Sequence, residues 1–257
     1  MDQQVGSGSL CFAKAPFIIG TASVVGTKEG EGPLADAFDC IGPDDKFGQQ
    51  TWEAAESSLQ KEALTLALGK AGLRAEELRY LFAGDLLGQS MATSFGLQSF
   101  EIPLFGLYGA CSTAGESLAL AAMTVAAGYA DVVGAVTSSH FASAEKQFRF
   151  PLEYANQRPL CTTWTVTGAG AFLLGRESGK KQNYSDNRKR TDSGSSMIKS
   201  AEQKVADDTE QTVCGVRITG ITTGKIVDYG VRDSMNMGAA MAPAAWDCLL
   251  YTSDAAD

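Results

Sequence analysis

Residues 104–128 read LFGLYGACSTAGESLALAAMTVAAG. This stretch begins with an apolar run, Leu104 to Tyr108, which predicts a short buried strand. A Gly-Ala turn and Cys111 follow, and an alanine-rich helix then extends to Gly128. Because this helix has almost no polar face, we expect it to be buried rather than amphipathic. The order of strand, turn and helix places Cys111 at or beside a helix N-terminus.

The position of Cys111 is suited to chemistry or to anion binding. Unpaired backbone N–H groups and the positive end of the helix dipole favour a thiolate and attract an anion at such a place. An inert core thiol is the alternative, because free cysteine is among the most buried residue types. The strand, the turn Gly109 to Ser112 and the helix resemble the nucleophile turn of the thiolase and ketoacyl synthase superfamily.

The composition limits the classes of function. A chain of 257 residues with 44% hydrophobic residues can bury one large core or two modest ones. Its net charge of −9 argues against nucleic acid as a partner, because phosphate binding needs a basic face. Six scattered cysteines and one histidine, His140, indicate a reducing compartment and no structural metal site. We find no secretion signal and no apolar run long enough to span a bilayer.

Alternating strands and helices precede and follow the central stretch. Strands are predicted at 17–25, 80–83, 104–108 and 131–137, with a strand pair at 164–174; helices are predicted at 52–69, 91–100 and after Cys111; loops are predicted at 26–50 and 141–159. The order βαβαβαββ predicts an α/β fold, a mainly parallel sheet covered by helices, with ligand chemistry at the carboxyl ends of the strands. Asp85, Cys111 and His140 each follow a different strand, so we expect them at one edge.

The first long helix, 52–69, has a capping Thr51 and an amphipathic pattern. We place its apolar face at Ala55, Leu59, Ala63, Leu66 and Ala67, and its charged residues Glu56, Lys61 and Glu62 elsewhere.

The chain changes character after residue 178. Residues 179–211 are polar and predict a solvated or disordered insertion. The apolar pattern resumes with a strand and turn from Val216 and a helix beginning near Asn236. The last ten residues, 248–257, do not continue this helix pattern and resemble a non-native, translated read-through tail. We therefore divide the chain into units at 1–178, 179–211, 212–247 and 248–257.

Several motifs together resemble one family, stage V sporulation protein AD, whose members are thiolase-like proteins of spore-forming bacteria. The motifs are FAGDLL at 82–87, GACST at 109–113, TSSH at 137–140, EKQFRFP at 145–151, TVTG at 165–168 and NMGAAMAPAA at 236–245. The resemblance implies a thiolase-like fold of two βαβαβαββ halves, of which this chain holds the first and the opening of a truncated second.

The resemblance also implies a function in sporulation and spore germination. Family members are understood to bind dipicolinic acid and to act with membrane proteins that move calcium dipicolinate into the forespore and out again. This implies a location on the cytoplasmic face of the spore inner membrane, held there peripherally by partners of the same transport complex. A homodimer is also consistent with the resemblance.

The candidate ligand-binding residues are Cys111, Ser112, His140, Asp85 and Arg149. Dipicolinate is a planar aromatic dianion, so a pocket for it needs donors or cations and an apolar wall. The turn after Cys111 supplies donors, His140 could donate a hydrogen bond, and Arg149 or Lys146 could supply charge. Asp85 would repel the anion unless it is protonated, orients His140 or helps to coordinate calcium. Each of these residues also has an ordinary structural interpretation, as a turn, interior or interface residue.

An acyltransferase of the ketoacyl synthase type is the alternative function. In such enzymes a cysteine takes an acyl group from a coenzyme A or carrier-protein thioester, and residues of the second half supply acid-base groups. Only Cys111 carries over from that catalytic set, because His140 lies in the first half. We therefore expect a binding protein in which Cys111 is vestigial, with no resident cofactor or metal.

Overall fold

The computed structural model describes residues 3–148, 165–177, 215–233 and 236–254. Its main sheet has six strands in the order β4-β3-β8-β7-β5-β6. Their bounds are Phe17–Val25 for β3, Cys40–Ile41 for β4, Tyr80–Gly84 for β5, Leu104–Leu107 for β6, Val132–Ser139 for β7 and Gly168–Gly175 for β8. Only β8 runs antiparallel to its neighbours within this sheet. The predicted α/β class with a mainly parallel sheet is confirmed.

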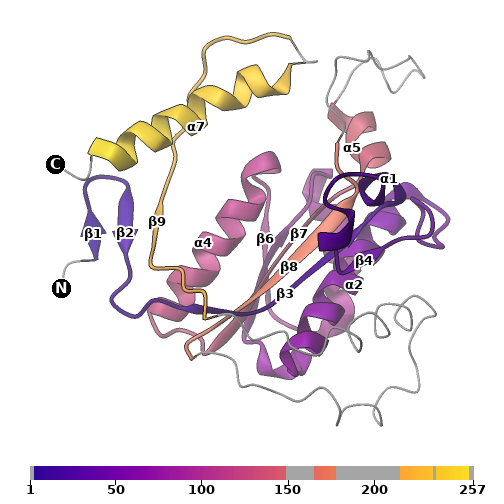
Figure 1. Cartoon of the computed structure of the whole chain (residues 1–257), viewed down its shortest axis with the longest axis horizontal. Coiled ribbons are helices and arrows are strands. Elements are labelled where there is room, and N and C mark those ends of the chain that lie inside the picture. Colours follow the sequence, from indigo (N-terminus) through magenta and orange to yellow (C-terminus); the bar gives the residue numbers. More distant parts are fainter. Residues whose placement is uncertain (1–2, 149–164, 178–214, 234–235, 255–257) are drawn as a thin grey trace.

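Helices cover both faces of this sheet (Figure 1). One face packs against α2 (Trp52–Ala71), which in turn packs against α3 (Met91–Leu97), and the opposite face packs against α4 (Thr113–Ala126). The Oγ1 of Thr51 accepts a hydrogen bond from the N–H of Ala54, and Gly72, with φ +64°, ends α2 in the left-handed region that glycine favours. The remaining short helices are α1 at Thr27–Gly30, α5 at Phe141–Phe148, and single 3-10 turns at Ala35–Ala37, Ala75–Glu77, Gly88–Ser90, Gln98–Phe100 and Ala110–Ser112.

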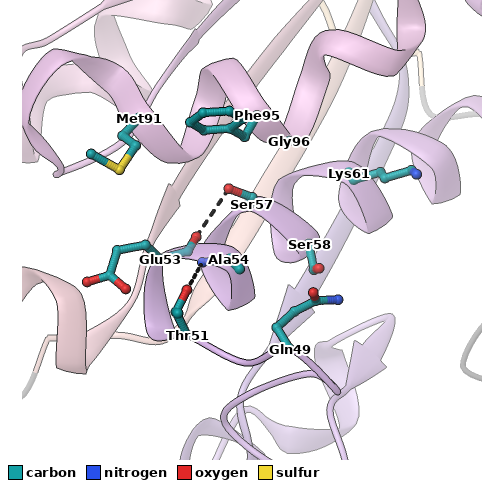
Figure 2. A pocket seen from close by; sticks show the side chains of 10 residues that line it. All are labelled: Gln49, Thr51, Glu53, Ala54, Ser57, Ser58, Lys61, Met91, Phe95 and Gly96. Atoms are coloured by element: carbon teal, nitrogen blue, oxygen red, sulfur yellow. Dashed lines mark hydrogen bonds between the residues drawn. The ribbon is translucent and has the colours of Figure 1, made fainter.

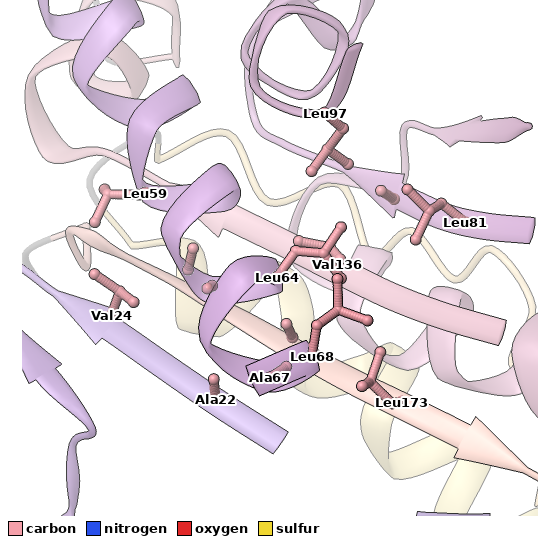
Figure 3. Close-up of a cluster of buried hydrophobic side chains, with 14 of the residues drawn as sticks. Ala22, Val24, Leu59, Leu64, Ala67, Leu68, Leu81, Leu97, Val136 and Leu173 are labelled. Carbon is pink, nitrogen blue, oxygen red and sulfur yellow. The ribbon is translucent and has the colours of Figure 1, made fainter. Parts of the chain in front are cut away.

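Two hydrophobic clusters lie on the two faces of the sheet. The larger lies under α2, where Leu59, Leu64 and Ala67 meet strand residues such as Val136 and Leu173 (Figure 3). The smaller lies under α4, where Ala121, Ala122 and Val125 meet Phe82, Val133 and Leu174. Strand residues alternate between the clusters because successive side chains of a strand point to opposite faces.

The stretch from Leu104 to Gly128 is less buried than its sequence predicts. Strand β6 is an edge strand with Leu104 and Phe105 exposed, and the outward side of α4 is open to solvent, with Met123 38% exposed. The prediction of a buried strand and a buried helix is therefore wrong for this chain. The residues are apolar, as the sequence shows, but no described element covers the outward side of α4 or the free edge of β6.

Three local predictions also need correction. The expected loop at 26–50 contains α1 and the two-residue strand β4, which pairs parallel with β3. The segment after His140 is helix α5 up to Phe148 rather than a loop. The expected strand pair at 164–174 is one strand among the described residues, β8; Trp164 lies outside them.

A second, three-stranded sheet joins the two ends of the described chain. Strands β1 (Gln4–Val5) and β2 (Ser9–Cys11) pair antiparallel, and β2 also pairs with β9 (Gly220–Thr222). Helix α7 runs from Met237 to Asp254. The expectation that the helix pattern stops before residue 248 is therefore wrong. The polar segment 179–211 lies outside the described residues.

Candidate functional site

The carboxyl ends of three parallel strands bring the predicted residues to one edge of the sheet. Gly84 of β5 is in register with Leu107 of β6 on one side and with Thr137 of β7 on the other. Asp85, the Cys111 turn and His140 follow these positions within a few residues. The edge is therefore shared, as expected for parallel strands.

Cys111 lies in the 3-10 turn that leads into α4, and it is exposed. The residue before it, Ala110, has φ +49°, a left-handed conformation that is uncommon for a residue with a Cβ. Thr113 and Ser112 close the turn, because Thr113 Oγ1 accepts from the Gly109 N–H at 3.1 Å and Ser112 Oγ donates to the Gly109 carbonyl at 2.8 Å. The turn therefore presents the Cys111 thiol at the surface, at the start of the helix.

Asp85 is buried, and its carboxylate accepts three hydrogen bonds. The donors are the N–H of Leu87 at 2.7 Å, the N–H of Thr93 at 2.7 Å and the hydroxyl of Thr93 at 2.5 Å. These bonds tie the end of β5 to the start of α3. The side chain thus lies on the α2 and α3 face of the sheet, whereas Cys111 opens the helix on the opposite face.

His140 is completely buried, and both ring nitrogens have partners within the chain. Nδ1 accepts from the Ala142 N–H at 3.1 Å, so Nε2 carries the hydrogen that is donated to the Asp45 carbonyl at 2.7 Å. The ring packs against Trp52 and Phe141 with centroids 5.4 and 5.2 Å away. Burial lowers the pKa of His140, so the neutral ring is favoured. A ligand contact by His140 would need these bonds to rearrange, and its predicted role stays a prediction.

A buried polar network between α2 and the strand ends escaped the sequence interpretation. Glu56, which was placed away from the apolar face of its helix, is 0% exposed, as is Gln60. The hydroxyls of Ser138 and Ser143 approach the two Glu56 carboxyl oxygens at 2.9 and 2.8 Å. Burial, opposed in part by these hydrogen bonds, raises the pKa of Glu56 to about 7.

A sequence signal for this network exists in the spacing of α2. Glu56 and Gln60 precede the core residues Leu64 and Leu68 at intervals of four, and residues four apart lie on one face of a helix. The prediction that Glu56 faces away from the core is wrong, because its position on the helix places it on the buried face although its side chain is polar.

A surface groove lies apart from this network. Arg149 is outside the described residues, and its role stays a prediction. A groove of about 420 Å³ runs between α2 and α3, with Met91 and Phe95 on one side and Ser57, Ser58 and Lys61 on the other (Figure 2). Of the predicted ligand residues, the four that the structure describes do not line it. Within the described ranges, no group of three or more His, Cys, Asp or Glu side chains is placed to hold a metal ion. No helix in those ranges is both long and apolar enough to cross a membrane.

Comparison with solved structures finds matches at low similarity. The 3-oxoacyl-[acyl-carrier-protein] synthase III of Aquifex aeolicus matches with a TM-score of 0.44 and 18% identity, covering 65% of this chain and 55% of that enzyme. OleA of Xanthomonas campestris matches with a TM-score of 0.42 and 17% identity, covering 65% of this chain and 57% of OleA.

Comparison of sequences gives a stronger match. The profile of the family described as stage V sporulation protein AD matches residues 6–254. The stage V sporulation protein AD of Bacillus subtilis (strain 168) is 34% identical over 244 residues, which is 95% of this chain and 62% of the relative. The chain thus spans less than two thirds of that relative's length. On the strength of the profile match, the chain belongs to the stage V sporulation protein AD family.

Proposed function

We propose that this sporulation-family protein binds dipicolinic acid at the edge of the sheet where Cys111 and Ser112 open helix α4. The observation that supports the proposal most directly is the exposed turn at this edge. Among the described residues, the N-terminus of α4 has no side-chain cap, and the N–H of its first residue, Thr113, donates to the Ala110 carbonyl. The backbone N–H groups that follow Thr113 in this first turn can serve a carboxylate. A dianion benefits from such donors and from the helix dipole.

Negative charge near the turn supports a cation that accompanies the ligand. A Cβ built on Gly109 would lie 2.7 Å from Glu116 Oε2, so the Glu116 carboxylate is close to the Cys111 turn. A free dianion would be repelled by Glu116 at this distance. Calcium bridging the ligand and a carboxylate removes that repulsion, because calcium prefers oxygen ligands.

We also propose where the protein acts and which partners it has. The protein would act in the forespore or spore, peripherally on the cytoplasmic face of the inner membrane, with membrane proteins of one transport complex. The exposed β6 edge, with Phe105 50% exposed, suits a homodimer, because an open strand edge can pair with a second copy.

Calorimetric titration of dipicolinic acid, with and without calcium chloride, tests the binding proposal. We expect saturable binding that weakens several-fold in Cys111→Ala. Cys11→Ala is the matched control, because Cys11 is an exposed free cysteine on β2, away from this edge. Absence of binding under all conditions, or equal weakening by both variants, would contradict the proposed site.

A second candidate function is acyl transfer from a thioester to Cys111. The observation that favours it is the exposed thiol in a turn with a left-handed Ala110. In that reaction the Cys111 sulfur attacks the thioester carbonyl as a thiolate, the carbon–sulfur bond to coenzyme A breaks, an enzyme thioester forms, and coenzyme A leaves as its thiolate. Incubation with acetyl-coenzyme A followed by mass spectrometry decides between the functions, because a stable acetyl group on Cys111 would reject a role in binding alone.

A further inference from the structure

The hydrogen atoms around Glu56 can be counted from the chemistry of its neighbours. Ser143 Oγ lies 2.8 Å from Glu56 Oε2 and 3.1 Å from the His140 carbonyl oxygen. A serine hydroxyl has one hydrogen, so Ser143 cannot donate to both. If Glu56 is protonated, its O–H donates to Ser143, and Ser143 donates to His140. Only the protonated acid gives both contacts a hydrogen.

The second carboxyl oxygen of Glu56, Oε1, is linked to the Asp85 loop through hydrogen bonds of Ser138, Gln60 and Thr93. Gln60 Nε2 lies 2.8 Å from Ser138 Oγ, 2.9 Å from Thr93 Oγ1 and 3.2 Å from the Gly84 carbonyl oxygen. An amide nitrogen has two hydrogens, and we assign them to the two shorter contacts. Ser138 then donates to Glu56 Oε1 at 2.9 Å, and Thr93 donates to Asp85 Oδ2 at 2.5 Å. One continuous chain of hydrogen bonds therefore joins the His140 carbonyl, after the end of β7, to the Asp85 carboxylate, after the end of β5.

The charges around Glu56 also favour the protonated acid. The charged groups that act on it are Asp85, at the end of β5, and Glu53, on α2 itself, and both are negative. From α3 the network presents Thr93, from β7 Ser138, and from α5 Ser143, all uncharged. His140 is neutral, as its two hydrogen bonds require. A buried carboxylate without a positive partner is unfavourable, so burial raises the pKa of Glu56 to about 7.

We propose that Glu56 is a positioning residue whose protonated form holds the β7–α5 turn and the Asp85 loop together at the edge that binds the anion, and that it loses this proton as the pH rises through neutrality. This inference rests on the proposed function, because the anion is the ligand proposed above. Loss of the proton to water leaves a buried carboxylate, deprives the His140 carbonyl of its bond from Ser143, and adds negative charge behind the site. Anion affinity then falls as the pH rises.

Infrared difference spectroscopy tests whether Glu56 carries a proton, and it needs no ligand. The spectrum of the unmodified chain minus that of Glu56→Gln, at pH 5.5, should contain the C=O band of a protonated carboxylic acid, and the band should vanish by pH 8.5. Glu76→Gln is the matched control, because Glu76 is an exposed carboxyl group outside this network. A missing acid band at pH 5.5, or a band that persists unchanged to pH 8.5, would overturn the proposal.

Titration with dipicolinic acid from pH 5.5 to 8.5 tests the effect on the site. We expect the affinity of the unmodified chain to fall by about tenfold per pH unit at most near pH 7, since one proton is coupled to binding. Glu56→Gln is neutral and nearly isosteric, so it should keep the affinity seen at low pH throughout. An equal pH dependence in this variant would overturn the proposal. Absence of binding at every pH would reject the proposed function, while the infrared band would still decide whether Glu56 holds the proton.

Discussion

The two faces of the main sheet differ in how completely they are sealed. On the α2 face, Leu59, Leu64 and Leu173 are fully buried, and α3 packs beside α2 over the same cluster. On the α4 face, the helix buries its inner residues Ala121 and Ala122 but leaves its outward side open. The sealed face holds the polar network of Glu56, and the open face carries the exposed turn of Cys111. The more completely buried core thus lies on one side of the sheet, and the exposed thiol lies on the other.

This difference teaches that composition alone does not predict burial. The α4 sequence is more apolar than that of α2, yet α2 is the better covered helix. Helix α3 packs beside α2 and adds Leu97 to the same cluster, whereas no described element packs on the outward side of α4. An apolar helix face can therefore be exposed where no described element packs on it.

The largest expected difference between the faces concerns core truncation. Leu64→Ala removes a side chain that is 0% exposed within the larger cluster. We expect the free energy of unfolding to fall by about 3 kcal/mol, because the cavity cannot close fully. Met123→Ala, on the outward side of α4, should cost less than about 1 kcal/mol. Urea unfolding followed by circular dichroism measures both, and equal losses would show that α4 is covered in solution.

A smaller effect is expected where the strand ends approach α4. A Cβ on Gly84 would contact the Leu107 carbonyl oxygen and lie 2.6 Å from Thr113 Cγ2. Gly84→Ala should therefore force β5 away from β6 and α4 and cost about 2 kcal/mol. The control is Gly106→Ala on β6, where a Cβ would meet no atom within 4 Å.

Thermal unfolding of the two glycine variants would distinguish a local clash from a general cost of replacing glycine. If Gly84→Ala is as stable as Gly106→Ala, the close approach of the strand end to the Cys111 turn is not a constraint in solution.

The pH dependence of stability should report on the sealed face. The pKa of Glu56 rises from its ordinary value of 4.5 to about 7 on folding, so between these values the folded state binds more protons. Stability therefore falls as the pH rises through this window, by about 1.4 kcal/mol per unit at most. Glu56→Gln should remove this contribution between pH 5.5 and 6.5 in urea unfolding.

His140 contributes to the pH dependence of stability with the opposite sign to Glu56. Its pKa is lowered from 6.5 by burial, so below pH 6.5 the folded state binds fewer protons than the unfolded state. Stability from this residue is present above pH 6.5 and is lost as the pH falls. Glu56→Gln should therefore become more stable as the pH rises from 5.5 to 6.5, whereas His140→Gln should become less stable. Parallel profiles in the two variants would contradict the assigned protonation states.

The sequence predicts the strands and helices of the first half well, and the reasons are local. Val, Ile and small residues mark β3 and β7, an apolar run of Tyr, Leu, Phe and Ala marks β5, and Thr51 and Gly72 mark the ends of α2. Side-chain placement depends on tertiary contacts that no local pattern contains. The sequence therefore identifies Asp85 and His140 as strand-end residues, but it does not show that their polar atoms already have partners within the fold.

Helix capping gives the smallest difference between the two faces. Thr51 Oγ1 accepts from the Ala54 N–H at 3.1 Å at the start of α2, whereas Ser112, at the start of α4, instead donates to the Gly109 carbonyl. Thr51→Ala should cost about 1 kcal/mol, because it leaves a helix N–H without its acceptor. Ser112→Ala should cost only a few tenths of this, since its exposed hydroxyl caps no N–H and water can replace it. Urea unfolding at pH 7 measures both variants. A larger cost for Ser112→Ala would mean that its hydroxyl does cap α4, and the free N–H groups proposed to receive a carboxylate would then already be occupied.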